Sequence, residues 1–199
     1  MPDDETLRFY AENAEVYAGR QRRLDDEQLS TFLAALPAGG DILELGTGGG
    51  QDAAYMLSAG FAVTPSDASA ELAAAAEILL GRPVKIMAFN QLDDVATYDG
   101  VWASAALLHA PAAELTEDIA RIHTALRPGS PLTASFKAGT GEGRDGLGRY
   151  YNYPSAQTLL AHFRAAADWA ALELTETDGG GYDGKPTRWL WVHATKALA

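Results

Sequence analysis

The chain of 199 residues contains no cysteine. This absence excludes disulfide bonds and thiolate metal ligands. The histidines include no pair spaced i, i+4, the spacing that places two imidazoles on one helix face as metal ligands. They are His109, His123, His162 and His193. We therefore expect no metal site.

Long apolar runs and basic residues are also scarce. No apolar stretch approaches the roughly 20 residues that span a bilayer, and residues 1–10 have neither a basic start nor an apolar segment, so we expect a cytoplasmic protein without membrane contact. The 15 basic residues against 27 acidic ones give a formal net charge of −12, which repels a phosphate backbone and favours neutral or cationic ligands over polyanions. We expect no nucleic-acid partner, although the basic cluster at 20–23 could act as a contact point.

Periodicity predicts alternating helices and strands in a single domain, residues 1–199. With 47% apolar residues the chain can close one sizeable core. Short apolar runs predict strands at 42–45, 61–64, 84–87, 100–103 and 131–136. Apolar residues at helical spacing predict helices around 29–36, 53–57, 72–79, 115–126 and 155–167. Such alternation is typical of a mostly parallel sheet with helices on both faces.

The C-terminal part departs from this rhythm. Residues 169–177 and 188–196 alternate apolar and polar side chains at period two, and a turn-rich connector joins them, which predicts an antiparallel hairpin. The predicted fold is therefore a three-layer α/β sandwich with a seven-stranded, mostly parallel, Rossmann-like sheet closed by that hairpin. Within it we expect an N-terminal helical cap (1–36), a cofactor-binding core (37–137), and a lid loop, helix and hairpin (138–199).

A glycine-rich turn follows the first strand. Gly46, Gly48 and Gly50 lie where ligands bind in such sheets, beyond the carboxyl end of a strand, although a tight structural turn is the alternative. A dinucleotide fingerprint GxGxxG would need glycine at 51 or 53, which are Gln51 and Ala53. The pattern is instead E-x-G-x-G-x-G, and an acid at position 44 could accept a hydrogen bond from an ammonium group.

Four segments together carry a family resemblance. They are LELGTGGG (43–50), VTPSDAS (63–69), YDGVWASAALLH (98–109) and ALRPGSPLTASFK (125–137). In this order they resemble the motifs of class I S-adenosylmethionine-dependent methyltransferases. The wider chain is similar to small bacterial stand-alone enzymes of the tellurite-resistance and type 11/12 groups.

The resemblance implies S-adenosyl-L-methionine as cofactor, with S-adenosyl-L-homocysteine as product. It places the glycine loop around the methionine part, Glu44 near its amino group and Asp67 on the ribose hydroxyls; an N-cap role for Asp67 is the alternative. The third motif departs from the family's acidic residue, and Asn90 would meet the adenine there. The implied cofactor-binding set is Glu44, Gly46, Thr47, Gly48, Gly50, Asp67, Ala68, Phe89, Asn90, Ala103 and Ser104.

Methyl transfer from a sulfonium is an in-line displacement that mainly requires alignment and exclusion of water. A general base helps only when the acceptor must lose a proton. His109 is the histidine placed at the cofactor end of a strand, so we interpret it as structural or cofactor-packing, with catalysis as the alternative. Tyr150 is the second catalytic candidate. The other three histidines are interpreted as structural.

The glycine-rich segment 138–153 is too long for an ordinary connector and is typical of a lid. The candidate acceptor-binding residues are Tyr10, Tyr17, Arg144, Arg149 and Tyr151. The alternative is that these side chains only pack a surface loop and a helix.

We expect a small-molecule methyl acceptor and a monomer or homodimer. Two other functions stay open: a catalytically silent nucleotide-binding or scaffold protein that retains the fold, and an NAD(P)-dependent reductase.

Overall fold

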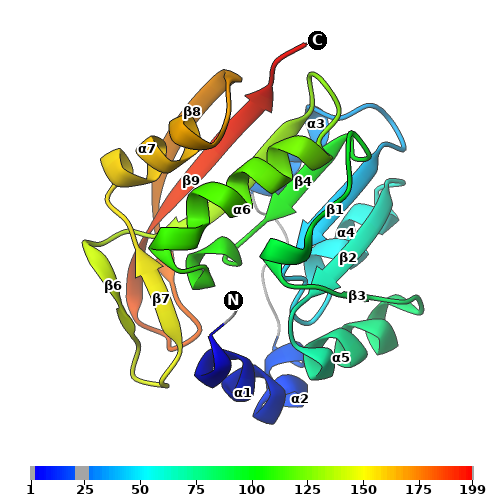
Figure 1. Ribbon diagram of the computed structural model, residues 1–199. Helices are drawn as coiled ribbons and strands as arrows, with labels where there is room; N and C mark the ends of the chain where they lie inside the picture. The colour runs from blue at the N-terminus through cyan, green and yellow to red at the C-terminus, as the bar shows by residue number, and fades with distance from the viewer. Residues whose placement is uncertain (1–2, 21–26, 199) are drawn as a thin grey trace.

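A seven-stranded sheet forms the centre of the computed structural model, which describes residues 3–20 and 27–198 (Figure 1). In spatial order the strands are β3 (Lys85–Ile86), β2 (Ala62–Asp67), β1 (Asp41–Leu45), β4 (Gly100–Ala103), β5 (Pro131–Lys137), β9 (Pro186–Lys196) and β8 (Trp169–Gly180). The first five run parallel, and β9 is antiparallel to both of its neighbours. The predicted fold class is confirmed.

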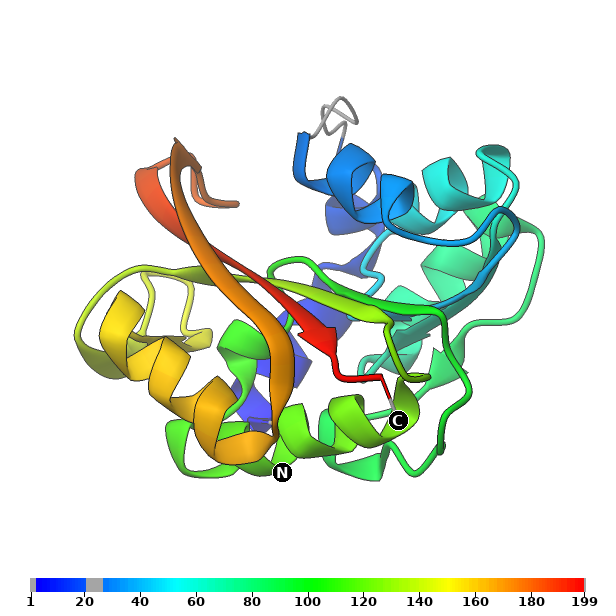
Figure 2. The same ribbon diagram turned by 90° about the horizontal axis from the view of Figure 1, so that it is seen from above.

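Helices cover both faces of this sheet. They are α3 (Glu27–Ala34), α4 (Gln51–Ser58), α5 (Ala70–Leu80), α6 (Ala112–Ala125) and α7 (Ala156–Ala166). Figures 1 and 2 show α6 and α7 on one face and α3 and α4 on the other. Side chains of β1 alternate between the two cores: Ile42 packs with Phe32 of α3, and Leu43 belongs to the cluster that contains Ile119 of α6. Burial on both faces explains why β1 is a continuous apolar run.

Two short helices, α1 (Asp4–Glu12) and α2 (Ala14–Ala18), lie below the carboxyl ends of β1 and β2 in Figure 1. Asp3 caps α1 by accepting a hydrogen bond from the Thr6 N–H. Positions 21–23 of the basic cluster lie outside the described residues. Within the part of the chain that the structure describes, no helix is both long and apolar enough to cross a membrane.

The segment predicted as a lid loop is instead a second, two-stranded sheet. β6 (Gly141–Arg144) pairs antiparallel with β7 (Tyr150–Tyr153). Asp145 builds the turn between them, because its Oδ1 accepts from the N–H groups of Leu147 and Arg149. Glycine at alternate positions of β6 removes the side-chain pattern that would predict a strand, which is why the prediction of a loop was wrong.

Candidate active site

The turn after β1 needs glycine for two separate reasons. Gly46 and Gly48 have φ of +71° and +55°, the left-handed region that side chains disfavour. A Cβ added at Gly46 would lie 2.6 Å from the Cβ of Ala106, and one at Gly48 would lie 3.1 Å from the Tyr17 ring. Backbone of this turn therefore approaches its neighbours more closely than any other residue type allows.

Three members of the predicted cofactor set support this turn from behind. Glu44 is buried, and its Oε2 accepts a hydrogen bond from the Thr47 hydroxyl. Gly50 begins α4, and a Cβ there would lie 3.2 Å from Ala76 on α5. Glu44, Thr47 and Gly50 line neither of the two cavities described below. The structure thus places them as a scaffold for the glycine turn.

Asp67, the last residue of β2, joins the turn to the next strand. Its Oδ2 accepts from the Gly48 N–H and its Oδ1 from the Ser69 N–H, both at 2.9 Å. Ser69 is the N-cap of α5, so the alternative N-cap role for Asp67 was wrong. Burial raises the pKa of Asp67, and these two N–H donors oppose the rise. A carboxylate has about four acceptor positions, so each oxygen can still accept a ligand hydroxyl.

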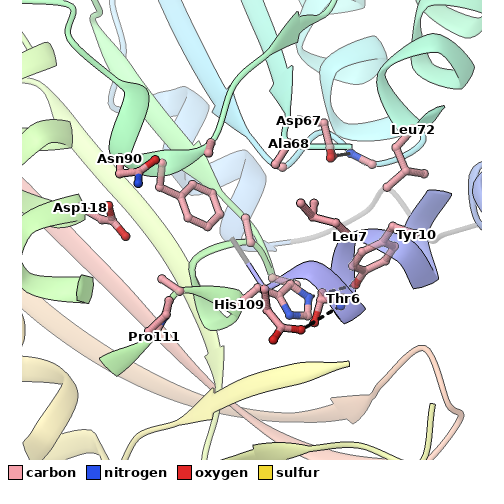
Figure 3. A pocket seen from close by; sticks show the side chains of 18 of the residues that line it. Thr6, Leu7, Tyr10, Asp67, Ala68, Leu72, Asn90, His109, Pro111 and Asp118 are labelled. Carbon is pink, nitrogen blue, oxygen red and sulfur yellow. Dashed lines mark hydrogen bonds between the residues drawn. The ribbon is translucent and has the colours of Figure 1, made fainter. Parts of the chain in front are cut away.

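A cavity, called here the first cavity, opens at the ends of β1, β2 and β3. Six residues of the predicted cofactor set line it: Gly46, Gly48, Asp67, Ala68, Phe89 and Asn90. Figure 3 shows Asp67 and Ala68 facing Leu7 and Tyr10 of α1 across this space. The structure therefore brings together residues that the sequence spreads over three turns.

The turn after β4 separates the first cavity from a second one. Ala103 is fully buried in β4 and lines neither cavity, whereas Ser104 lines the second. Ala105 has φ +52° and lines both, and its N–H donates to Ser135 Oγ at 2.7 Å. A left-handed alanine is a strained conformation of the kind that gathers at functional sites.

The second cavity is the larger, about 680 Å³ against about 90 Å³ for the first. Of the predicted acceptor-binding residues, Tyr10, Tyr17, Arg149 and Tyr151 line it. Its lining also contains four residues that the sequence analysis missed: Lys137, Tyr182, Trp189 and Trp191. The period-two pattern of 188–196 already placed both tryptophans on one face, which was an available signal. Lys137 ends its strand as Asp67 does, but the sequence does not show that it is buried.

A chain of hydrogen bonds crosses the boundary between the cavities. Arg149 donates to Asp145 Oδ2 at 2.6 Å and to the Tyr10 hydroxyl at 3.2 Å. The Tyr10 hydroxyl lies 3.0 Å from His109 Nε2, and His109 Nδ1 lies 2.7 Å from the Tyr150 carbonyl. A carbonyl only accepts, so Nδ1 carries the proton and Nε2 accepts from Tyr10. Burial lowers the pKa of His109 to about 4, which keeps the ring neutral at pH 7.

Two predicted residues lie away from both cavities. The Tyr150 hydroxyl donates to Glu142 Oε1 on the neighbouring strand. Arg144 pairs with both carboxylate oxygens of Asp3, at 2.7 and 2.9 Å, and ties the hairpin to α1. Neither side chain is in the lining of either cavity.

Comparison with solved structures identifies the fold. The 1,6-didemethyltoxoflavin-N1-methyltransferase of Burkholderia thailandensis, with bound 1,6-didemethyltoxoflavin and S-adenosylhomocysteine, has a TM-score of 0.72 at 23% identity over 97% of this chain and 88% of that one. The CcbJ methyltransferase of Streptomyces caelestis gives 0.72 at 19% identity over 99% and 100%. The N-methyltransferase NodS of Bradyrhizobium japonicum WM9, in complex with S-adenosylhomocysteine, gives 0.64 at 16% over 98% and 99%. At these identities the likeness establishes the fold.

The family follows from sequence. A model of the methyltransferase domain matches residues 17–170, so the chain belongs to the methyltransferase domain family. It is an S-adenosylmethionine-dependent methyltransferase. No curated protein gives a significant match to this chain. The narrower likeness to tellurite-resistance and type 11/12 enzymes stays a prediction.

Proposed function

We propose that the protein methylates a small-molecule acceptor bound in the second cavity, with the cofactor in the first. The observation that carries this proposal is the boundary shared by the two cavities, formed by Tyr10, Tyr17, Ala105 and His109. Adjoining cavities allow an in-line approach of the acceptor to a methyl group held at this boundary. A neighbour of the same fold that binds the small molecule 1,6-didemethyltoxoflavin supports an acceptor of similar size.

The residues of the first cavity suit the cofactor. Asp67 can accept from both ribose hydroxyls, and the exposed backbone at Gly46 and Gly48 admits close contact with the methionine part. Phe89 offers a ring to the adenine, and Asn90 offers an amide. S-adenosylmethionine supplies an electrophilic methyl group on its sulfonium when bound.

Alignment and exclusion of water are the tasks left to the chain. Tyr10 is held between Arg149 and His109, so its ring has a fixed orientation at the boundary. His109 is a weak base, because its pKa is about 4 and its Nε2 already accepts from Tyr10. We therefore assign His109 the positioning of Tyr10 in place of general-base catalysis. Tyr150 is assigned to the hairpin, because its hydroxyl binds Glu142.

Two blocking variants test the division between cavities. Ala68→Trp places an indole in the first cavity, and Thr177→Trp places one in the second. We expect Ala68→Trp to weaken S-adenosylhomocysteine binding at least tenfold in calorimetry. Thr177→Trp should leave that affinity within twofold of wild type but stop methylation of components of metabolite extracts by methyl-labelled S-adenosylmethionine. Undiminished methylation by Thr177→Trp would contradict the proposal.

Selective binding of NAD by the wild type would favour the reductase alternative. Binding of S-adenosylhomocysteine without any methylated product would favour the silent scaffold. The cytoplasmic location and the monomeric or homodimeric state stay predictions.

A further inference from the structure

Lys137 is a buried cation in the second cavity. It is the last residue of β5, and only 7% of its surface is exposed. Its ammonium nitrogen lies 4.2 Å from the centre of the Tyr151 ring. In the β5–β9 register it is directly opposite Trp189, so both side chains share one face of the sheet. The ammonium group therefore lies against an aromatic ring at the cavity wall, on the sheet face that Trp189 shares.

Within the part of the chain that the structure describes, no carboxylate forms an ion pair with Lys137, although Asp183 and Asp145 attract its ammonium group from farther away. Its side chain makes no hydrogen bond and no ion pair there, whereas the neighbouring Arg149 is bound to Asp145 through two nitrogens. Burial and then the charge of Arg149 lower the pKa of Lys137. Removing an ammonium group from water without an ionic partner is costly, and the tyrosine ring recovers only part of that cost.

The surrounding charges limit what can neutralise Lys137. Asp183, on the β8–β9 turn, attracts the Lys137 ammonium group but also lies 3.9 Å from the Lys185 nitrogen. Asp145 attracts it as well but is already paired with Arg149. Glu27 and Asp178 also line the second cavity. These acids disfavour a polyanion, and Lys137 disfavours a cation. A single negative charge is the complement that remains.

Flat side chains make up the rest of the wall. Tyr151, Tyr182, Trp189 and Trp191 present rings to the second cavity. Rings of this kind favour a planar conjugated ligand, which can stack on them or meet their edges. The rings would therefore contact the aromatic body of a ligand, and Lys137 would contact its anionic group.

We propose that the acceptor is a planar aromatic molecule bearing one carboxylate, and that the carboxylate pairs with Lys137 while the aromatic body stacks on the rings of the second cavity. This proposal rests on the proposed function, because it treats the second cavity as the acceptor site. It departs from the bias towards neutral or cationic ligands that the net charge of −12 suggests, because Lys137 supplies a positive charge at this wall.

Matched probes measure the charge preference directly. 4-Hydroxybenzoate, 4-hydroxybenzamide, 4-hydroxybenzylamine and phenyl phosphate have similar rings with a negative, neutral, positive and doubly negative group. Each is titrated into protein saturated with S-adenosylhomocysteine, and again without it, by calorimetry and tryptophan fluorescence. We expect 4-hydroxybenzoate to bind wild type roughly tenfold more tightly than any other probe.

Variants assign that preference to one residue. Lys137→Met should bind 4-hydroxybenzoate roughly tenfold more weakly and the amide within twofold of wild type. Lys137→Arg should retain part of the preference. Lys185→Met, which removes an exposed lysine outside the second cavity, should behave as wild type. An affinity for S-adenosylhomocysteine within twofold of that of wild type shows that Lys137→Met is folded. If Lys137→Met does not fold, the affinity of Lys137→Arg for the carboxylate and the amide tests the role of Lys137.

The outcomes separate the two proposals. Equal affinity for carboxylate and amide, no carboxylate binding to wild type, or an unchanged preference in Lys137→Met would each overturn the role of Lys137. Failure of wild type to bind S-adenosylhomocysteine would overturn the proposed function instead, and the titrations without it would still measure the charge preference.

Discussion

The two halves of the site are built in different ways. The first cavity takes its predicted lining from the turns after three parallel strands, between positions 46 and 90. The second combines α1 and α2 with the ends of β4 and β5, the β6–β7 hairpin and the β8–β9 hairpin. One wall of the first cavity is thus encoded by short motifs, with α1 and residues 105–118 closing the other side, whereas the second cavity depends on tertiary assembly throughout. A cofactor shared by a family suits the first construction, and an acceptor particular to one enzyme suits the second.

The two cavities also differ in how their buried charged side chains are stabilised. In the first, Asp67 receives two backbone N–H donors from its own and the neighbouring turn. In the second, Arg149 is 1% exposed and depends on Asp145 four residues away. Substitutions around the second cavity should therefore change the stability of the fold most, and substitutions around the first cavity should change ligand affinity most.

Arg149→Ala should give the largest effect. It leaves Asp145 buried without its cation, and breaking a buried pair in this way costs about 3 kcal/mol or more. Urea denaturation measures the loss. Arg144→Ala is the matched control, since its ion pairs are on the surface and should contribute under about 1 kcal/mol. Equal losses of unfolding free energy in the two variants would show that the buried Arg149–Asp145 pair contributes no more to stability than the surface pairs of Arg144.

Asp67→Ala should act on binding. It removes the acceptor for the ribose hydroxyls, so affinity for S-adenosylhomocysteine in calorimetry should fall roughly 100-fold. Asp67→Asn keeps one acceptor oxygen, so its affinity for S-adenosylhomocysteine should lie between those of wild type and Asp67→Ala. A melting temperature is measured in parallel, and an affinity loss explained wholly by unfolding would count against a direct contact.

Tyr10→Phe should affect turnover at the boundary of the cavities. It removes the hydroxyl that joins Arg149 to His109, and we expect kcat/KM to fall roughly tenfold while S-adenosylhomocysteine affinity changes less than twofold. Tyr55→Phe, on α4 and outside both cavities, is the control and should change neither quantity. If Tyr10→Phe were as active as this control, the Tyr10 hydroxyl would have no role in turnover.

His109 predicts a pH dependence of stability. Its pKa is about 4 in the folded chain and 6.5 ordinarily, so below pH 6.5 the unfolded chain takes up a proton that the folded chain does not. The folded state should therefore lose stability as the pH falls from 6.5 towards 4. Denaturation at pH 6.5 and 5 should show a smaller decrease for His109→Gln than for wild type. Parallel decreases would mean that His109 is charged in the folded protein.

Tyr150→Phe should have the smallest effect. The hydroxyl binds Glu142 on a partly exposed hairpin, away from both cavities, so turnover and S-adenosylhomocysteine affinity should stay within twofold of wild type. This expectation replaces the catalytic role suggested by the sequence. A tenfold loss of kcat with unchanged stability would restore that role.

The fold and part of the lining of the first cavity could be predicted from the sequence because their signals are local. Buried parallel strands give apolar runs, Gly46 and Gly48 mark positive φ, and Asp67 follows a strand end. The acceptor half could be read only in part. Tyr151 and Arg149 were found from composition, but the hairpin that carries them was hidden by alternating glycines.

Side-chain direction could not be predicted from the sequence. Glu44 and Thr47 bind each other behind the turn, and sequence spacing alone does not show which side of a turn a residue faces. Lys137 was missed because a lysine at a strand end is usually solvated; only its burial and the packing of Tyr151 against its ammonium group make the residue unusual.

The central claim is that the cofactor occupies the first cavity with its sulfur directed towards the second. A crystal structure of the complex with S-adenosylhomocysteine tests this claim most directly. We predict both ribose hydroxyls on Asp67, the adenine beside Phe89, and the sulfur at the boundary formed by Tyr10, Tyr17 and Ala105. A ligand bound within the second cavity, or one whose ribose lies away from Asp67, would contradict the account.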